Sequence, residues 1–360
     1  MRFSSLRTTA FRNIADVEVD TTGKDIFLVG ENGQGKTNFL EALYFCSYAS
    51  SFRSVRDGDL ACTGEKNFSV AAVLKSPLYE KVLIKYEESK KIIIIDGKRI
   101  EDRKGLLSVI PCIVFCHEDM EFISGSPERR RWFFDQSQSL YNPLYLDDLR
   151  KYRRVLKTRN AVLKEGFGRP DTTMLDTLDP QIAEYGLRLM ENRAAAAADF
   201  SDTFGPLYEE VSGIAGITIR YVPSWKFQSV EKIRDLLGSC REKDAAAGIC
   251  LSGPHRDRYI FTRGNAEFSG HASTGQRRLL ALLLRSAQAR RFSEKTGVNP
   301  VLLLDDVLLE LDGEKRRKFL SVMPQYDQAF FTFLPEEPYK RYCKSDTLVY
   351  QVKAGKAAKL

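Results

Sequence analysis

Hydrophobic residues in the first 115 positions occur in short runs separated by turns. The run 25–29 (DIFLV) is typical of a buried strand, and 37–49 places Leu40, Leu43 and Tyr44 on one helical face. Asp96-Gly97 separates two further apolar runs and predicts a hairpin turn. A continuous apolar run at 109–116 predicts another buried strand. This part of the chain is therefore expected to be rich in strands.

From residue 127 the pattern changes to helical spacing. Pro127 is a suitable first residue of a helix. A second pattern begins at Pro180 and is expected to end at Gly205-Pro206. Between them lies an amphipathic helix whose apolar positions are Tyr145, Leu149, Tyr152, Leu156 and Leu163. We expect residues 126–213 to form an inserted, mostly α-helical lobe, with 1–125 and 214–360 forming a discontinuous α/β domain.

Strand patterns return after the expected lobe. A strand is predicted at 217–223, a helix near 229–242, and a long helix over 273–292. The apolar run 301–304 is typical of a central parallel strand, and 328–333 is expected to be the final strand.

Composition limits the class of protein. The 360 residues carry a formal charge of +7, which permits a polyanionic partner without requiring one. The N-terminus lacks the apolar core of a signal peptide, and the longest apolar runs, such as 92–95, are far too short to span a membrane. Seven scattered cysteines form no CxxC pair, and Cys112, Cys116 and His117 have no second ligand pair nearby. We expect a cytoplasmic protein without a membrane partner, a disulfide framework or a zinc site.

The stretch GENGQGKT at 30–37 follows the predicted strand 25–29 and opens the predicted helix. It fits the phosphate-binding pattern G-x4-G-K-[ST]. Glycines permit turned backbone, and the turned N–H groups and the helix start bind phosphate oxygens. Lys36 is expected to reach the β- and γ-phosphates, and Thr37 to bind Mg²⁺. The predicted nucleotide-binding residues are Gly30, Glu31, Asn32, Gly33, Gln34, Gly35, Lys36 and Thr37.

Two adjacent carboxylates follow the predicted strand 301–304. The carboxyl ends of parallel strands are where nucleotides bind in open α/β sheets. Adjacent aspartates repel unless a cation or a proton separates them. We therefore expect Asp305 to hold Mg²⁺ through water and Asp306 to polarise the attacking water.

A third motif, STGQ, opens the long helix predicted near 273. Ser273, Gly275 and Gln276 lie where free N–H groups form another anion site. One bound nucleotide does not need two anion sites in one chain. Two nucleotides that are each shared between two chains do need both sites in every chain.

Together these motifs resemble ABC-type ATPase heads of the SMC-like DNA-repair class, and more narrowly the RecF family. The P-loop, the S-x-G-Q signature and LLLDD…ELD carry the broader resemblance. The narrower one rests on FRN, GENGQGKTNFLEAL, SFR, VFCHEDMEFISGSPERRRWFFD, LSGPHRD, STGQRR and LLLDDVLLELD, which run from residue 11 to 312.

The resemblance implies a head that dimerises on ATP. Ser273, Gly275 and Gln276 of one copy would contact the γ-phosphate bound to Lys36 of the other, and Ser273, Gln276, Lys36 and Asp306 would be the catalytic residues. Asp312 would lie in the loop that crosses the interface. The segment VFCHEDMEF lies where related ATPases carry a glutamine that contacts the metal, and this chain has His117, Glu118 and Asp119 there. Such ATPases often place a histidine after the last strand, where this chain has only Thr332 nearby, which is consistent with slow hydrolysis.

The resemblance also implies DNA as a partner. The family binds gapped or junction DNA, acts as a recombination mediator with RecR and, through it, RecO, and supports replication, recombinational repair and SOS induction. Two basic clusters fit a polyanion surface, although each also fits an ordinary solvated face. They are Arg150, Lys151, Arg153, Arg154, Lys157 and Arg159 in the expected lobe, and Lys90, Lys91, Lys98, Arg99, Arg103 and Lys104 near the hairpin.

Other residues and functions stay open at this stage. Arg129, Arg130 and Arg131 fit either a nucleotide or DNA, and His255 and Arg256 fit either a site or a structural role. A small-metabolite kinase would need no second phosphate cradle, so STGQ argues against it. A nucleotide-binding scaffold would not need the paired Asp305 and Asp306.

Overall fold

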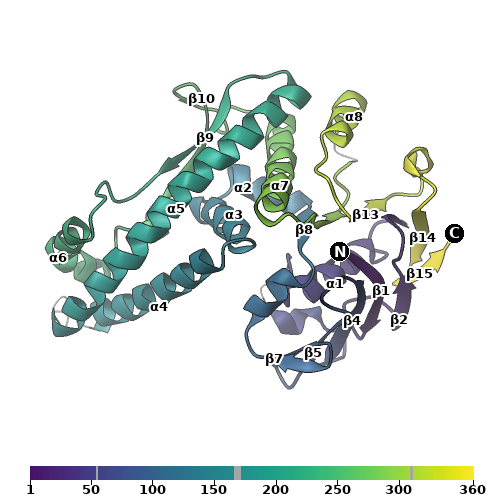
Figure 1. Cartoon of the computed structure of the whole chain (residues 1–360), viewed down its shortest axis with the longest axis horizontal. Helices are drawn as coiled ribbons and strands as arrows, with labels where there is room; N and C mark the ends of the chain where they lie inside the picture. The colour runs from purple at the N-terminus through teal and green to yellow at the C-terminus, as the bar shows by residue number, and fades with distance from the viewer. Residues whose placement is uncertain (54–55, 166–171, 309–310) are drawn as a thin grey trace. The chain divides into compact units, whose positions relative to one another are not determined.

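The computed structural model describes residues 1–53, 56–165, 172–308 and 311–360. The chain divides into two compact units (Figure 1). The first comprises Met1–Asp119 and Ala289–Leu360, and the second comprises Met120–Gln288. The expected lobe 126–213 falls within the second unit, and its expected boundaries stay a prediction.

The first unit is built on a six-stranded sheet with strand order β15-β14-β3-β13-β12-β8. The five strands from β14 to β8 are parallel, and β15 pairs antiparallel to β14. Four predicted strands are confirmed as β3 (Asp25–Val29), β8 (Cys112–Phe115), β12 (Val301–Leu304) and β13 (Gln328–Phe333), and every residue in them is buried. Continuous apolar runs form strands here because both faces of the sheet are covered.

The prediction that 328–333 is the final strand is wrong. Two more strands follow, β14 (Thr347–Lys353) and β15 (Lys356–Lys359). β14 buries Tyr350 and Val352 while its lysine stays exposed. This part of the chain lacks the continuous apolar run of the central strands. The sequence pattern therefore did not indicate that two more strands extend the sheet.

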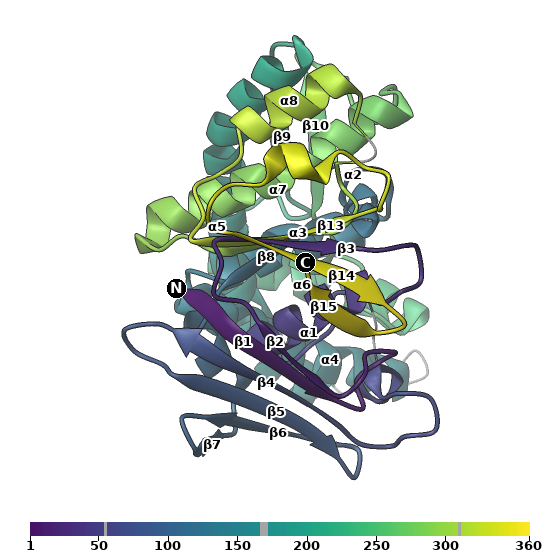
Figure 2. The same ribbon diagram turned by 90° about the vertical axis from the view of Figure 1, so that its right-hand side faces the viewer.

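A second, antiparallel sheet in the first unit has strand order β2-β1-β4-β5-β6-β7. The helix α1 (Lys36–Tyr48) contacts strands of both sheets and lies between them (Figure 2). The predicted turn at Asp96-Gly97 is confirmed, with φ angles of 48° and 80°. The antiparallel strands are β1 (Arg2–Thr9), β2 (Val17–Asp20), β4 (Phe68–Lys75), β5 (Lys81–Glu87), β6 (Lys90–Ile95) and β7 (Lys98–Ile100). The first unit also contains α8 (Gly313–Ser321).

The second unit is mostly helical. Three helices, α4 (Pro143–Glu165), α5 (Thr172–Ser212) and α6 (Val230–Ala247), pack around a core that includes Trp225 (Figure 1). Shorter helices α2 (Glu121–Ser124) and α3 (Pro127–Ser139) precede them. A three-stranded sheet contains β9 (Ile217–Val222), β10 (Arg258–Arg263) and β11 (Ala266–Glu267). α7 (Thr274–Thr296) begins in this unit and ends in the first.

The predicted helix end at Gly205-Pro206 is wrong, because α5 continues through Pro206 to Ser212. A proline inside a helix removes one backbone hydrogen bond. Buried Phe204, Leu207 and Tyr208 flank this point, so packing on both sides keeps the helix continuous.

No helix in the described ranges is both long enough and apolar enough to cross a membrane.

Candidate nucleotide site

The loop 30–35 joins β3 to α1 in backbone that favours glycine. Gly33 and Gly35 have φ angles of 77° and 108°, in the left-handed region where a Cβ is unfavourable. A Cβ on Gly30 would lie 2.3 Å from the carbonyl oxygen of Val352 on β14. The loop therefore needs glycine both for its turn and for the close approach of the neighbouring strand.

Segments from both ends of the chain hold this loop in place. The Nδ2 group of Asn13 donates to the carbonyl of Gly33 over 3.1 Å. The carbonyl of Gln34 accepts from the N–H of Gly355 over 2.9 Å, and its side-chain Oε1 accepts from the N–H of Ala354 over 2.7 Å. The β14–β15 turn thus supports the loop, and the sequence patterns gave no sign of this.

Lys36 begins α1 and is buried, with an exposed fraction of 4%. Its Nζ donates to the carbonyls of Gly30 and Glu31 over 2.7 and 3.1 Å. Both are carbonyls of the loop itself, so the ammonium lies inside the cradle that the sequence predicts for phosphates. The side chains of Glu31 and Asn32 are exposed at the outer edge of the loop.

Thr37 and Asp305 meet as the sequence predicts for a magnesium site. The Thr37 hydroxyl donates to Asp305 Oδ1 over 2.9 Å, although the residues are 268 positions apart. Burial and the charge of Asp306 raise the pKa of Asp305 to about 6, while the hydrogen bonds from Thr37 and Thr332 act in the opposite direction. A bound cation would relieve this repulsion, so the residues fit Mg²⁺.

Thr332 on β13 completes the acid pair. Its hydroxyl oxygen accepts from the N–H of Asp306 over 2.8 Å and lies 2.8 Å from Asp306 Oδ1 and 3.2 Å from Asp305 Oδ1. Asp306 has a φ of 52°, an uncommon conformation for a residue with a Cβ. One buried hydroxyl thus positions both carboxylates.

A second group beside the loop was not predicted as part of the site. Glu41, fully buried on α1, accepts from Arg12 over 2.9 and 3.0 Å and from Arg53 over 2.6 Å. Burial acts to raise the pKa of Glu41, but these hydrogen bonds hold it below its ordinary value. The signal in the sequence was that Arg12, Glu41 and Arg53 lie in FRN, GENGQGKTNFLEAL and SFR, three of the stretches carrying the family resemblance.

The two arginines line a cavity of about 490 Å³ next to the loop. Asn13 and Asn38 line the same cavity, and the Nδ2 group of Asn38 donates to Asn13 Oδ1 over 2.5 Å. Beside the predicted phosphate cradle, the cavity therefore presents two guanidinium groups that are paired with Glu41, two amides and the carboxylate of Asp59.

The turn after β8 lies beside Asp305, since the N–H of Asp305 donates to the carbonyl of Phe115 over 2.9 Å. In that turn Asp119 is buried and accepts from the N–H of Cys116 over 3.0 Å. His117 and Glu118 are exposed. Asp119 therefore has a structural role, and a metal contact by this segment stays a prediction.

The signature residues belong to the second unit, so the first unit by itself contains only part of the predicted site. Ser273 and Gln276 form a reciprocal capping box at the start of α7. The Ser273 N–H donates to Gln276 Oε1 over 2.8 Å, and the Gln276 N–H donates to Ser273 Oγ over 3.3 Å. A Cβ on Gly275 would meet no atom within 4 Å, so packing inside this chain does not require glycine there.

The basic cluster on α4 is not a single surface, and including Arg159 in it was wrong. Arg159 is fully buried and pairs with Asp179 and Asp244, each over 2.8 Å. These partners lie on α5 and α6, so the arginine ties three helices together. The exposed members are Arg150, Lys151, Arg153, Arg154 and Lys157.

In the hairpin cluster, Lys91 is also committed to contacts within the chain. Its ammonium donates to the carbonyl of Ala49 over 2.7 Å and pairs with Asp57 over 2.8 Å. Lys90, Lys98, Arg99 and Arg103 are exposed.

The ambiguous residues of the second unit mostly have structural contacts. Arg130 and Arg131 donate to the carbonyls of Tyr259 and Asp257 over 3.1 and 2.6 Å. His255 Nε2 lies 2.9 Å from the carbonyl of Cys250, and its Nδ1 lies 2.8 Å from the Tyr152 hydroxyl. A carbonyl only accepts, so Nε2 carries a proton. Burial lowers the pKa of His255 to about 4, so the ring is neutral at pH 7 and its Nδ1 accepts from the Tyr152 hydroxyl.

Within the described residues, no group of three or more histidine, cysteine or acidic side chains is arranged to hold a metal ion. Cys46 and Cys112 are buried, and burial raises the pKa of both thiols above the ordinary value. These cysteines are structural.

Comparison with known proteins shows the family of this chain. The family model described as the RecF/RecN/SMC N terminal domain matches residues 2–356. The "DNA replication and repair protein RecF" of Treponema pallidum (strain Nichols) is 46% identical over 347 residues, covering 96% of this chain and 97% of the relative.

Solved structures give the same result. A structure of the recombination mediator protein RecF-ATP in the RecFOR pathway is 26% identical, with a TM-score of 0.89, and covers 100% of this chain and 97% of that one. An SMC head bound to a domain of ScpA is 15% identical with a TM-score of 0.56, covers 100% of this chain and 98% of that one, and shows a shared fold alone. The family model matches nearly the whole chain, and a relative 46% identical is matched over almost its full length. This chain therefore belongs to the RecF family of SMC-like ABC-type ATPase heads.

Proposed function

We propose that this chain is an ATP-gated, DNA-binding recombination mediator. The observation that carries the proposal is the cluster of Thr37, Asp305, Asp306 and Thr332 at the end of the phosphate loop. A loop that only turned the chain would need neither the two hydroxyls nor the paired carboxylates. A relative's structure described as RecF-ATP supports ATP as the nucleotide.

In this proposal residues 30–37 hold the triphosphate. The backbone N–H groups of the loop and the start of α1 bind phosphate oxygens, and Lys36 exchanges its two carbonyl partners for them. Thr37 and Asp305 would hold Mg²⁺, which neutralises the charge of the triphosphate. The cavity lined by Arg12, Asn13, Asn38 and Arg53 would receive the nucleoside.

Hydrolysis depends on Asp306 as the group that polarises water. Thr332 orients this carboxylate through the hydroxyl between the two aspartates. A hydroxyl is a far weaker base than the histidine of many related ATPases. Slow, DNA-stimulated hydrolysis is therefore part of the proposal, and ATP acts as a timer.

The second half of the site would come from another copy of the chain. Ser273, Gly275 and Gln276 are exposed or partly exposed at the start of a long helix, where N–H groups bind anions. Gly275 has open space around its Cα, and a phosphate on another chain could approach it closely. ATP would then join two copies, each nucleotide lying between Lys36 of one and Ser273 of the other.

DNA would bind to exposed basic residues such as Arg150, Arg154 and Lys157 on α4 and Arg99 in the hairpin. Gapped or junction DNA is the proposed substrate, and RecR with RecO the proposed partners, as the RecFOR pathway named for the solved relative indicates. Support of replication, recombinational repair and SOS induction follows from that role.

The test is a salt-titrated binding assay on gapped, single-stranded and duplex DNA, with and without ATP. The proposal predicts that ATP prolongs DNA retention and that Asp306→Asn, which blocks hydrolysis, prolongs it further. Lys36→Arg is the control without a functional cradle and should show no ATP effect. DNA retention that is the same with and without ATP would contradict the proposal, and unchanged ATP lifetime in Asp306→Asn would leave only a scaffold.

A further inference from the structure

The second unit contains a cavity that the nucleotide site does not use. It has a volume of about 390 Å³, within the range of small-molecule sites. Its lining brings together two stretches that are far apart in the sequence, SPERRRWFFD on α3 and LSGPHRD before β10. The residues that matter are Arg131, Trp132, Arg153, Arg193, His255 and Arg256.

The floor of this cavity is rigid and internally satisfied. Arg193, 3% exposed, donates through Nε and Nη2 to the two oxygens of Asp135, each over 3.0 Å. Its Nη1 donates to Asp257 over 2.9 Å and to the carbonyl of Pro254 over 2.6 Å. The Tyr145 hydroxyl donates to Asp135 over 2.5 Å. These carboxylates are therefore already paired and do not repel an incoming anion strongly.

Two arginines at the rim have weak partners inside the chain. Arg153 is 59% exposed and lies 3.3 Å from Asp135, whose oxygens already accept from Arg193. Arg256 is exposed, and its Nη2 lies 3.5 Å from the carbonyl of Cys250, at the limit of a hydrogen bond. Four arginines line the cavity, namely the two at the rim, Arg193 and buried Arg131. The lining contains two carboxylates, Glu128 and Asp135, and Asp257 lies beneath the floor. The rim is thus suited to a phosphate.

Trp132 lies beside these arginines and is 41% exposed, which is unusual for so large an apolar side chain. Its ring stacks on Phe122 with centroids 5.8 Å apart and an interplanar angle of 23°. The guanidinium of Arg285 lies 4.8 Å from the centroid of Phe122. The indole is therefore the exposed end of a stack, where one more flat ring would extend it.

We propose that this cavity binds one unpaired nucleotide of single-stranded DNA, with the base stacked on Trp132 and its phosphate between Arg153 and Arg256. The inference rests on the proposed DNA binding and gives it a specific site. An acidic peptide would satisfy the arginines but has no use for the exposed indole. An aromatic face beside guanidinium groups is the arrangement by which proteins hold single-stranded nucleic acid.

The chain offers an internal reporter for this site. It has two tryptophans, and the other, Trp225, is fully buried in the second unit. Base stacking quenches indole fluorescence, so the full chain is titrated with an oligothymidylate and with an abasic oligonucleotide of equal length and charge. We expect oligothymidylate to quench fluorescence and to bind about fivefold or more tightly than the abasic strand. Trp132→Phe should keep this preference but lose the quenching.

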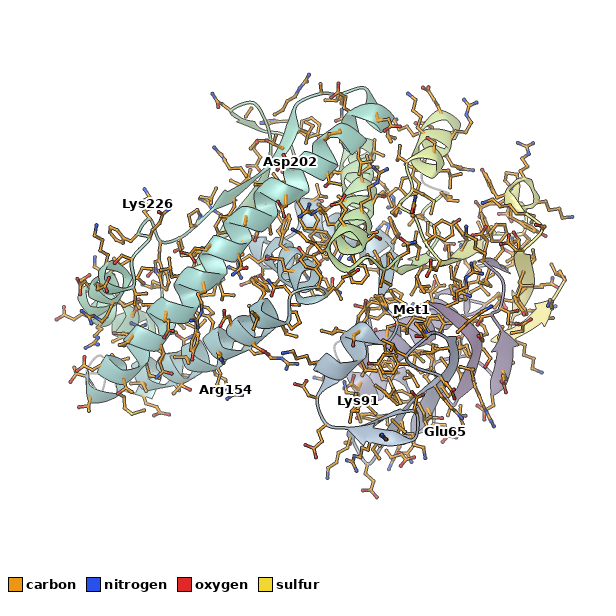
Figure 3. The ribbon with its side chains drawn as sticks, in the orientation of Figure 1. Met1, Glu65, Lys91, Arg154, Asp202 and Lys226 are labelled. Atoms are coloured by element: carbon orange, nitrogen blue, oxygen red, sulfur yellow. The ribbon has the colours of Figure 1, made fainter. Side chains whose placement is uncertain are left out.

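Matched substitutions separate the cavity from general charge. Trp132→Ala should abolish the preference for oligothymidylate, and Arg153→Ala should weaken binding to it by about fivefold or more. Arg154→Ala removes the same charge one residue along α4, at an exposed position (labelled in Figure 3). Arg154 does not belong to the lining of the cavity. Arg154→Ala should weaken binding to oligothymidylate and binding to the abasic oligonucleotide equally.

Three outcomes would overturn the inference. Equal binding of the two strands with no quenching would show a phosphate site without base recognition. Competition by polyglutamate as effective as that by oligothymidylate would show an acidic-peptide site. Trp132→Ala binding like the original chain would show that the indole has no part. If ATP still prolonged retention on duplex DNA in those cases, the proposed function would stand, whereas a wild-type chain that binds no DNA would contradict the proposed function itself.

Discussion

Thr332 contacts both aspartates of the candidate site. It was expected only as a substitute for a histidine, and these contacts were not predicted. It lies on β13, while Asp305 and Asp306 follow β12, so its contacts arise only from strand pairing. Lys36, Thr37 and Asp305 could be predicted because each has a fixed place in a short motif. Neither Thr332 nor the buried Glu41 with its two arginines belongs to such a motif, and their place in the site becomes visible only once the chain is folded.

Substituting Thr332 tests its control of the acid pair. Thr332→Val keeps the shape but leaves the Asp306 N–H without its acceptor, which should lower the free energy of unfolding by about 1–3 kcal/mol. ATP hydrolysis should fall by about tenfold or more because Asp306 loses its orientation. Urea unfolding and single-turnover hydrolysis measure the two effects, and Thr332→Ser, which keeps the hydroxyl, is the control. Hydrolysis unchanged in the valine variant would show that Thr332 only packs.

His255 makes a prediction about pH. Burial holds its folded-state pKa at about 4, below the ordinary value of 6.5. Between pH 6.5 and 4 the unfolded chain therefore binds more protons at this residue than the folded chain does. The stability that the neutral ring contributes is fully present above pH 6.5 and is lost as the pH falls toward 4. At pH 5 the loss is about 2 kcal/mol. We expect the wild type to lose that much more unfolding free energy between pH 7.5 and 5 than His255→Gln, and equal losses would refute a neutral buried ring.

At the scale of elements, the two faces of α4 show what sequence spacing can and cannot decide. The apolar positions Tyr145, Leu149 and Tyr152 predicted the buried face correctly. Arg159 was grouped with the exposed basic residues because its partners, Asp179 and Asp244, lie on other helices. The same limit applies to α5, whose Gly205-Pro206 pair indicated an end that packing overrides. It applies also to β14, whose pattern has no long apolar run.

Two arginines on α4 should therefore behave in opposite ways. Arg159→Leu leaves buried Asp244 without its arginine and should cost about 3–5 kcal/mol of unfolding free energy. Arg154→Ala should change stability by about 0.5 kcal/mol or less while weakening DNA binding and reducing its salt dependence by about one ion. Thermal unfolding and salt-titrated DNA binding on both variants check this. Equal stability of the two variants would contradict the buried triad.

At the scale of the whole molecule, the sequence predicted the α/β ATPase head and a helical part, and the family comparison shows that fold. The structure adds that helix α7 starts in the second unit and ends in the first. The signature residues thus lie in a different unit from the phosphate loop. Sharing of a nucleotide between two copies stays a proposal, because motif spacing along one chain carries no information about a second chain.

The most direct measurement of that sharing mixes two inactive variants and determines their mass with ATP. Lys36→Ala lacks a working cradle but keeps its signature, and Ser273→Arg keeps the cradle but blocks the signature. Each alone should stay monomeric by light scattering with ATP, while the wild type dimerises. The mixture should form heterodimers holding one ATP, because one complete site remains. A mixture as monomeric as its components, or either variant dimerising alone as the wild type does, would contradict the shared site.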